Sequence, residues 1–221
     1  MRVSIFDIIG PVMVGPSSSH TAGAARIGRM ARRLLGEDVA EAELLLYGSF
    51  LATHRGHGTD KALVAGLMDM APDDVRLRDS FIHAEAAGLR FRFGEAQLRQ
   101  AHPNTVVLNL KGVSGRALSM QAASVGGGNI RVDVLNGLPV NFTGRQNTLI
   151  IPHTDQPGRI AAVTACCAQF GLNIASMQVF RDSMGGRAVM IIETDGTPAP
   201  QMLEWMRALP GISDVIFIAK E

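Results

Sequence analysis

The strongest constraint on the fold is a regular alternation of strand-like and helix-like segments between residues 147 and 221. The stretches 147–152 and 173–181 have the apolar pattern of strands, and a helix is predicted between them. Four apolar residues recur there at helical spacing; they are Ile160, Val163, Cys167 and Phe170. Gly171 is the expected end of this helix, because glycine readily adopts the left-handed conformation of a C-terminal cap.

The second half of this region repeats the alternation in a different order. A turn at 182–186 leads into a strand at 187–194, because its residues tolerate positive φ. A helix is predicted at 197–209, with Pro198 near its start, where the missing N–H costs nothing. A last strand is predicted at 215–219. The order is β-α-β-β-α-β, the ferredoxin-like arrangement.

The residues before this region have a less regular α/β pattern. Helices are expected at 21–35 and 59–70. Strands are expected at 42–47, 89–93, 105–110 and 129–134, while 4–9 and 116–124 fit either a strand or a helix. We therefore predict an α/β (α+β) chain of two domains, separated by the polar stretch at 141–145. Residues 1–142 form a domain on a mixed sheet, and residues 147–221 form the ferredoxin-like domain.

Composition narrows the class of protein. The chain has 221 residues and a net charge of +1, so charge gives no reason to expect nucleic acid or a membrane surface as a partner. No signal peptide and no apolar run of about 20 residues is present, and we expect a cytoplasmic protein. The two cysteines, Cys166 and Cys167, are adjacent. They are best interpreted as small buried residues on a helix, because an iron–sulfur cluster usually needs four thiolates.

The most informative motif is a run of hydroxyl side chains directly before the first helix. Ser17, Ser18, Ser19 and Thr21 surround His20. Backbone N–H groups are unpaired at a helix N-terminus and the helix dipole is positive there, so a carboxylate would be bound well. His20 adds a group that titrates near neutrality. Helix capping alone needs one such residue, and we therefore predict a functional role.

A second candidate lies in the strand-to-helix segment 48–61. Such loops commonly form ligand sites in α/β proteins. His57 stands there between two glycines, which leave space for a ligand beside it. Thr59 or Asp60 also fits a capping role for the following helix. A metal site with His54 is weakly supported because no acidic ligands cluster nearby, so acid–base chemistry or carboxylate binding is the preferred interpretation.

Two further segments are weaker candidates. His102 and Asn104 lie in a polar turn before a strand, where an incidental histidine is equally plausible. Gly126, Gly127 and Gly128 would let the backbone approach a ligand or a partner closely. They do not match a dinucleotide-binding motif, because no helix is predicted to follow.

The C-terminal region resembles an ACT domain, a module attached to many enzymes of amino-acid metabolism. The resemblance rests on Asp155, Pro157 and Gly158 before the first helix and on Gly171–Ile174 after it. In that family the loop at Asp155–Gly158 often meets an amino-acid ligand at a domain interface. The alternative is that Pro157 merely starts the helix and Gly158 merely lets it pack, and the sequence leaves both open.

The ordered set of motifs resembles the beta subunit of the bacterial iron–sulfur L-serine dehydratases over essentially the whole chain. The matching motifs are Gly15–Thr21, Gly56–Lys61, His102–Asn104 and Ser124–Gly128, followed by the ACT domain. The resemblance implies conversion of L-serine to pyruvate and ammonia. It also implies a [4Fe-4S] cluster that is ligated by a separate alpha subunit, with no metal held by this chain.

Roles for individual residues follow from the same resemblance. His57 would be the base that removes the α-proton, with His20 as a second catalytic residue. The substrate-binding residues would be Ser17, Ser18, Ser19, Thr21, Thr59 and Asn104. The Gly126–Gly128 loop would line the subunit junction, and self-association through the ACT or beta domain is expected. The alternatives are a regulatory serine-binding subunit, as in the allosteric domain of some phosphoglycerate dehydrogenases, and a free-standing amino-acid sensor.

Overall fold

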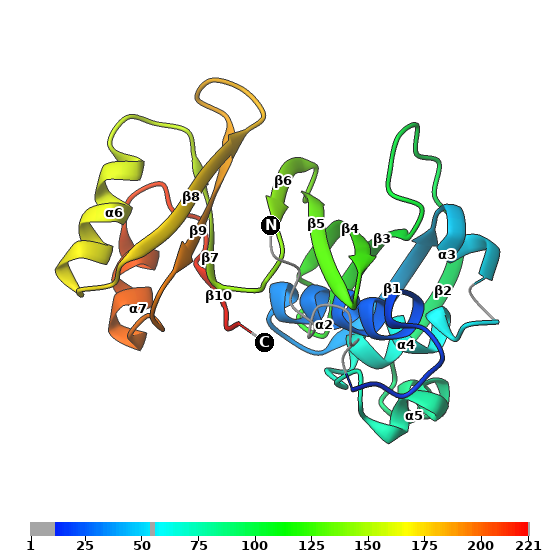
Figure 1. Cartoon of the computed structure of the whole chain (residues 1–221). Helices are drawn as coiled ribbons and strands as arrows, with labels where there is room; N and C mark the ends of the chain where they lie inside the picture. The colour runs from blue at the N-terminus through cyan, green and yellow to red at the C-terminus, as the bar shows by residue number, and fades with distance from the viewer. Residues whose placement is uncertain (1–11, 54–55, 221) are drawn as a thin grey trace, which may run out of the picture. The chain divides into compact units, whose positions relative to one another are not determined.

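The computed structural model describes residues 12–53 and 56–220, and the chain divides into two compact units after Gly137 (Figure 1). The strand β6 (Leu138–Phe142) is grouped with the second unit, whereas the sequence placed the domain boundary just after it. The segment predicted at 4–9 lies outside the described residues.

The first unit contains a sheet and a layer of helices. Its helical elements are η1 (Ser18–Ala22), α2 (Gly23–Leu35), α3 (Gly48–Thr53), α4 (Thr59–Leu67), η2 (Val75–Asp79) and α5 (Ser80–Ala86). Its strands are β1 (Val39–Leu46), β2 (Arg90–Glu95), β3 (Thr105–Gly112), β4 (Ala117–Gly126) and β5 (Asn129–Leu135). The predicted helices and strands are confirmed within a few residues at their ends, and the ambiguous segment 116–124 is a strand.

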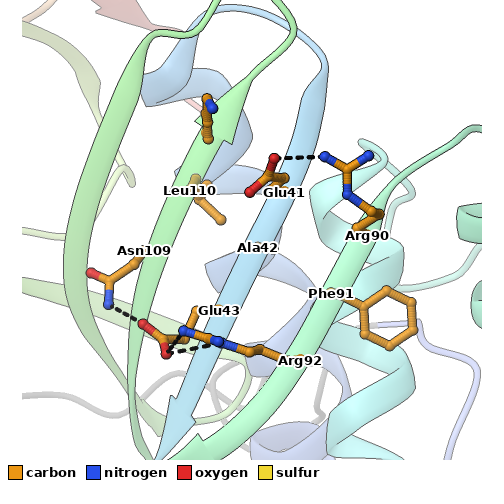
Figure 2. A pocket seen from close by; sticks show the side chains of 9 residues that line it. Glu41, Ala42, Glu43, Arg90, Phe91, Arg92, Asn109 and Leu110 are labelled. Atoms are coloured by element: carbon orange, nitrogen blue, oxygen red, sulfur yellow. Dashed lines mark hydrogen bonds and ion pairs between the residues drawn. The ribbon is translucent and has the colours of Figure 1, made fainter.

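The strands of this unit lie in the order β2-β1-β3-β4-β5. β1 pairs in parallel with β2 and antiparallel with β3, so the predicted mixed sheet is confirmed. One face carries buried apolar residues such as Leu44 and Leu108. The opposite face of β1, β2 and β3 carries charged and polar side chains (Figure 2). This alternation follows from the two-residue period of a strand.

Helix α2 buries the apolar face that its spacing predicts. Ile27, Ala31 and Leu34 are fully buried. The helix ends at Gly36, whose φ of 79° is left-handed and whose N–H donates to the Arg32 carbonyl. Glycine is required at such a position because other residues adopt this conformation at a cost.

Helices α2 and α4 touch through their backbones at Gly28 and Gly66. A Cβ atom added to Gly66 would lie 2.7 Å from the Arg29 backbone nitrogen, and one added to Gly28 would lie 2.9 Å from the Gly66 Cα. No side chain fits at either position without moving one helix away from the other. The glycines therefore fix the distance between the two helices.

The second unit contains a four-stranded antiparallel sheet in the order β10-β7-β9-β8. Its remaining elements are β7 (Asn147–Thr154), α6 (Arg159–Gln169), β8 (Ile174–Arg181), β9 (Arg187–Thr194), α7 (Pro200–Ala208) and β10 (Ile216–Ile218). The chain order from β7 onward is β-α-β-β-α-β, as predicted. Gly171 follows α6 with a φ of +67°, which confirms its role at the helix end.

One helix start in this unit was predicted wrongly. Helix α7 begins at Pro200, so Pro200 and not Pro198 occupies the first turn. Ala199 is extended, with ψ at 143°. The reason is steric, because a residue that precedes proline is pushed out of the helical region.

The two cysteines lie in the core of this unit, on α6. Cys166 and Cys167 are both free and buried, packed with Met202 and Met206 of α7. Burial raises the pKa of the Cys167 thiol to about 11, with the neighbouring Cys166 as a smaller cause. The interpretation as small buried residues is confirmed. No helix in the described part of the chain is long and apolar enough to cross a membrane.

We predict that Gly66→Ala destabilises the chain by about 1–3 kcal/mol through overpacking. At an exposed helix position the same change would stabilise the chain by about 1 kcal/mol, because alanine has the higher helix propensity. A loss of stability would therefore report the close contact. Chemical unfolding of the full chain measures the effect. Gly56→Ala is the control, since its added Cβ would have its nearest neighbour at 3.7 Å and should change stability by less than about 0.5 kcal/mol. Equal stability of both variants would contradict the close contact.

Candidate functional site

The run of hydroxyl side chains forms the start of the first helix. Ser17 is extended and its hydroxyl accepts a hydrogen bond from the His20 backbone N–H at 3.1 Å, which makes it the N-cap. The capping role is therefore filled by Ser17 alone. Ser18 and Ser19 are half-buried in the first turn, and Thr21 is buried. This turn leads directly into α2.

The His20 ring is held on both of its nitrogens. Nδ1 lies 3.2 Å from the Ser17 hydroxyl, and Nε2 lies 3.0 Å from the Ser49 hydroxyl on α3. The edge of the ring packs against Phe50, with 5.6 Å between ring centroids. The second predicted catalytic histidine, His57, is close by, since the two imidazole centroids are 5.2 Å apart. The structure thus brings together two motifs that lie 37 residues apart in the sequence.

Burial lowers the pKa of His20 below its ordinary value, and repulsion from the second imidazole, His57, lowers it further. Both causes disfavour the imidazolium. His20 is therefore largely neutral at pH 7, which is the form that can accept a proton.

The backbone of His57 is fixed while its side chain is exposed. Its N–H donates to the Thr53 carbonyl at 3.1 Å, and its own carbonyl accepts from the Thr21 hydroxyl at 3.2 Å. The next residue, Gly58, has a φ of 68° and is the N-cap of α4. An exposed imidazole on a fixed backbone is accessible to a ligand.

Thr59 is fully buried at the start of α4, and its hydroxyl has no hydrogen-bond partner in the described residues. The capping position of this helix is Gly58, so neither Thr59 nor Asp60 is the N-cap. Asp60 instead accepts a hydrogen bond from the Lys61 N–H. An unpaired buried hydroxyl is costly. It is consistent with a polar group that binds here.

The turn at His102–Asn104 is hydrogen-bonded to the start of α3. The carbonyl of Pro103 accepts hydrogen bonds from the backbone N–H groups of Ser49 and Phe50, at 2.8 and 3.4 Å. A Cβ added to Gly48 would lie 2.7 Å from the same carbonyl oxygen. The turn therefore holds α3, and with it Ser49, beside His20. The backbone N–H of Asn104 donates to His102 Nδ1 at 3.1 Å.

Sequence reasoning did not identify Ser49 or Phe50 as site residues, and it did not predict α3. The helix has only six residues and begins at Gly48, which has a φ of 56°. Its first N–H groups are satisfied by the distant Pro103 carbonyl, which no local pattern reveals. The one available signal was a serine directly after a buried strand.

The three glycines at 126–128 form the turn between β4 and β5. Their φ angles are 104°, 58° and 76°, all left-handed. No helix follows, as predicted. The Gly128 carbonyl accepts a hydrogen bond from Arg26 of α2 at 2.8 Å. The turn is therefore anchored to the helix that begins in the candidate site, while its place at a subunit junction stays a prediction.

In the ACT-like loop, the Asp155 carboxylate is engaged by Arg181 at 2.7 Å and by the Gly185 N–H at 3.2 Å. The hydrogen bond from Arg181 is the main cause that lowers the pKa of Asp155. Pro157 precedes Gly158, the N-cap of α6, which has a φ of 86° and open space around an added Cβ. Gly158 is needed for its conformation, so the idea that it only makes room for packing is wrong.

A hollow on the polar sheet face, seen in Figure 2, is lined by paired charges. Arg90 pairs with Glu41 at 2.6 Å, and Arg92 pairs with Glu43 at 2.7 Å. Asn109 also donates to Glu43, and this hydrogen bond is the largest cause that lowers the pKa of that carboxyl. These four charges are paired with one another, and Lys111 also lines the hollow.

The described residues contain no group of three or more histidine, cysteine or acidic side chains that would hold a metal ion. His54, the possible partner of His57 in a metal site, lies outside those residues. The only cysteines are buried in the core on α6, and their raised pKa values keep them as thiols. A [4Fe-4S] cluster needs thiolates, so this chain does not fit one.

Comparisons with known proteins give matches in both units of the chain. Residues 4–90 match the family model described as serine dehydratase beta chain, and residues 148–211 match the ACT domain. The chain is 41% identical to "Probable L-serine dehydratase, beta chain" of Bacillus subtilis, over 98% of both chains. It is 35% identical to "L-serine dehydratase, beta chain" of Peptoniphilus asaccharolyticus, over 87% of both chains. The chain belongs to the L-serine dehydratase beta chain family.

The chain is also similar to proteins that carry other names. It is 28% identical to D-3-phosphoglycerate dehydrogenase of Archaeoglobus fulgidus, over 88% of this chain and 37% of that protein. The shared region therefore occurs as part of a longer chain with another name. The resemblances to the beta-chain family and to the ACT domain that the sequence indicated are both confirmed.

We predict that His20 titrates below about pH 6.5, the ordinary value for histidine, and that His57→Asn raises its pKa by removing the second imidazole. NMR titration of the ring protons measures both. Because the folded-state pKa is lowered, neutral His20 contributes stability above the unfolded pKa, and this contribution is lost as pH falls through the folded pKa. A midpoint above 6.5 would contradict the burial of the ring.

Proposed function

We propose that this chain is the beta subunit of an L-serine ammonia-lyase, which converts L-serine to pyruvate and ammonia together with a separate alpha subunit. The observation that carries the proposal is the pair of imidazoles, His20 and His57, 5.2 Å apart at the hydroxyl-rich start of a helix. Membership of the beta-chain family supports the substrate class. We expect the complex to act in the cytoplasm.

The first task of the site is to hold the substrate carboxylate. Ser18 and Ser19 lie in the first turn, where backbone N–H groups and the positive end of the helix dipole favour an anion. Ser17 shapes this turn as its cap, and Thr21 holds the backbone of His57 through its hydroxyl. We assign the carboxylate to this turn, with Thr59 and Asn104 as further substrate-binding residues.

The second task is removal of the α-proton. His57 is exposed beside the turn, on a backbone held at both its N–H and its carbonyl. A positioned histidine is the commonest general base in enzymes. We assign the base to His57. His20 is the second catalytic residue, since its ring stands between the turn and Ser49.

Departure of the hydroxyl group needs chemistry that this chain does not contain. Its two cysteines are buried thiols in the ACT core, so a [4Fe-4S] cluster would be held by the alpha subunit. When bound, such a cluster supplies a Lewis acid for the serine hydroxyl. The contribution of this chain is to bind, to orient and to accept a proton. Self-association through the ACT or N-terminal domain completes the proposed assembly.

A regulatory serine-binding subunit is the second candidate. It is favoured by the similarity to D-3-phosphoglycerate dehydrogenase over 88% of this chain, because the same fold occurs there without the dehydratase name. In that case the site would sense serine without transforming it. A free-standing amino-acid sensor would bind serine alone and would purify without an iron–sulfur protein.

We predict that His57→Ala lowers the maximal rate of serine-dependent pyruvate formation by about 10²–10⁴, the usual contribution of a general base. The measurement is anaerobic, with this chain co-expressed with a cysteine-rich alpha partner. His83→Ala is the matched control, because His83 lies on α5 and interacts electrostatically with Asp74. It should leave the rate unchanged.

Two results would overturn this assignment. An unchanged maximal rate for His57→Ala would remove His57 as the base. If His20 and His57 variants shift the serine concentration needed for activation but spare the maximal rate, the chain is regulatory. Absence of any serine turnover by the complex, with the cluster loaded, would contradict the dehydratase itself.

A further inference from the structure

The two hydrogen bonds of the His20 ring have different origins. Ser17, on the Nδ1 side, is three residues away and belongs to the same turn. Ser49, on the Nε2 side, comes from α3 and is 29 residues away. A local turn explains the first contact, but only the fold explains the second.

The hydrogen bonds around Ser17 indicate which ring nitrogen carries the proton. The Ser17 hydroxyl oxygen already accepts from the His20 backbone N–H at 3.1 Å. Its own O–H is then free to donate, and His20 Nδ1 is the acceptor at 3.2 Å. A neutral imidazole has one donor and one acceptor nitrogen. In that arrangement Nε2 carries the proton and donates to the Ser49 hydroxyl, 3.0 Å away.

Ser49 is itself held rigidly. Its backbone N–H donates to the Pro103 carbonyl at 2.8 Å, and its carbonyl accepts from the Thr53 hydroxyl at 2.7 Å. The neighbouring Phe50 is fully buried and packs edge-on against His20. The Ser49 backbone is thus held independently of His20, as is expected of a residue that orients another.

We propose that Ser49 is a positioning residue that holds the His20 ring through Nε2, with His20 as the Nε2–H tautomer and Nδ1 as the hydrogen-bond acceptor facing Ser17. The inference rests on the proposed function, because it deepens the role of His20 in the same site.

The surroundings of His20 explain why orientation matters. The described groups in contact with the ring are Ser17 on its own turn, Ser49 and Phe50 on α3, and His57 before α4. Of these, His57 is the one other titratable group, and repulsion from it lowers the pKa of His20. No carboxylate is among these contacts, so the two hydroxyls are the hydrogen-bond partners that orient the ring.

The test is ¹⁵N NMR of the imidazole nitrogens in the full chain, with His20 signals assigned by their loss in His20→Gln. In the wild type we expect Nδ1 to have the shift of an acceptor and Nε2 that of a protonated nitrogen. Ser49→Ala should increase the Nδ1–H form and move the His20 titration midpoint. Ser49→Thr, which keeps a hydroxyl, should restore both. Ser119→Ala is the control, because that serine donates to Asn109 on the polar sheet face.

Kinetics of the complex with the alpha partner give the second readout. Ser49→Ala should lower kcat about 10- to 100-fold, as for outer partners of ligand histidines, with little change in KM and a shifted acid limb of the pH profile. Unchanged ¹⁵N shifts, or changed shifts with an unchanged rate and pH profile, would overturn the proposal. The NMR result needs no turnover, so failure of the proposed dehydratase activity is seen separately.

Discussion

The close contact between α2 and α4 is the constraint on which the candidate site depends. Gly28 and Gly66 let the two helices touch through their backbones. Each helix is preceded by one of the two motifs, so this contact determines where His20 and His57 meet. The hydrogen bond from Thr21 to the His57 carbonyl then joins the motifs directly.

Much of the fold could be predicted from the sequence, because most helices and strands follow from local apolar periodicity. The apolar spacing of α2 and the alternation from β7 to β10 specify their elements directly. The Ser17–Thr21 motif stood out because capping needs one hydroxyl residue, and the structure uses Ser17 for it. The burial of Cys166 and Cys167 could also be predicted, because a free cysteine on an apolar helix usually behaves as a small hydrophobic residue.

The remainder depends on contacts that are distant in the sequence. Helix α3 is too short to have a periodic pattern, and it is stabilised by the Pro103 carbonyl more than 50 residues away. Ser49 lies in the candidate segment 48–61, but its contact with the ring of His20, 29 residues away, is not visible in any local pattern. The start of α7 was misplaced because Pro198 and Pro200 both fit a first turn, and the extended Ala199 decides between them.

The central claim is that the hydroxyl- and imidazole-bearing turn before α2 binds the serine carboxylate. The most direct measurement is a titration of the full ¹⁵N-labelled chain with L-serine, followed by backbone amide shifts. The account predicts that the largest saturable changes occur at Ser18–Thr21 and His57–Thr59. Shift changes confined to Asp155–Gly158 of the ACT domain would contradict it. So would the absence of any shift change at a large molar excess of serine.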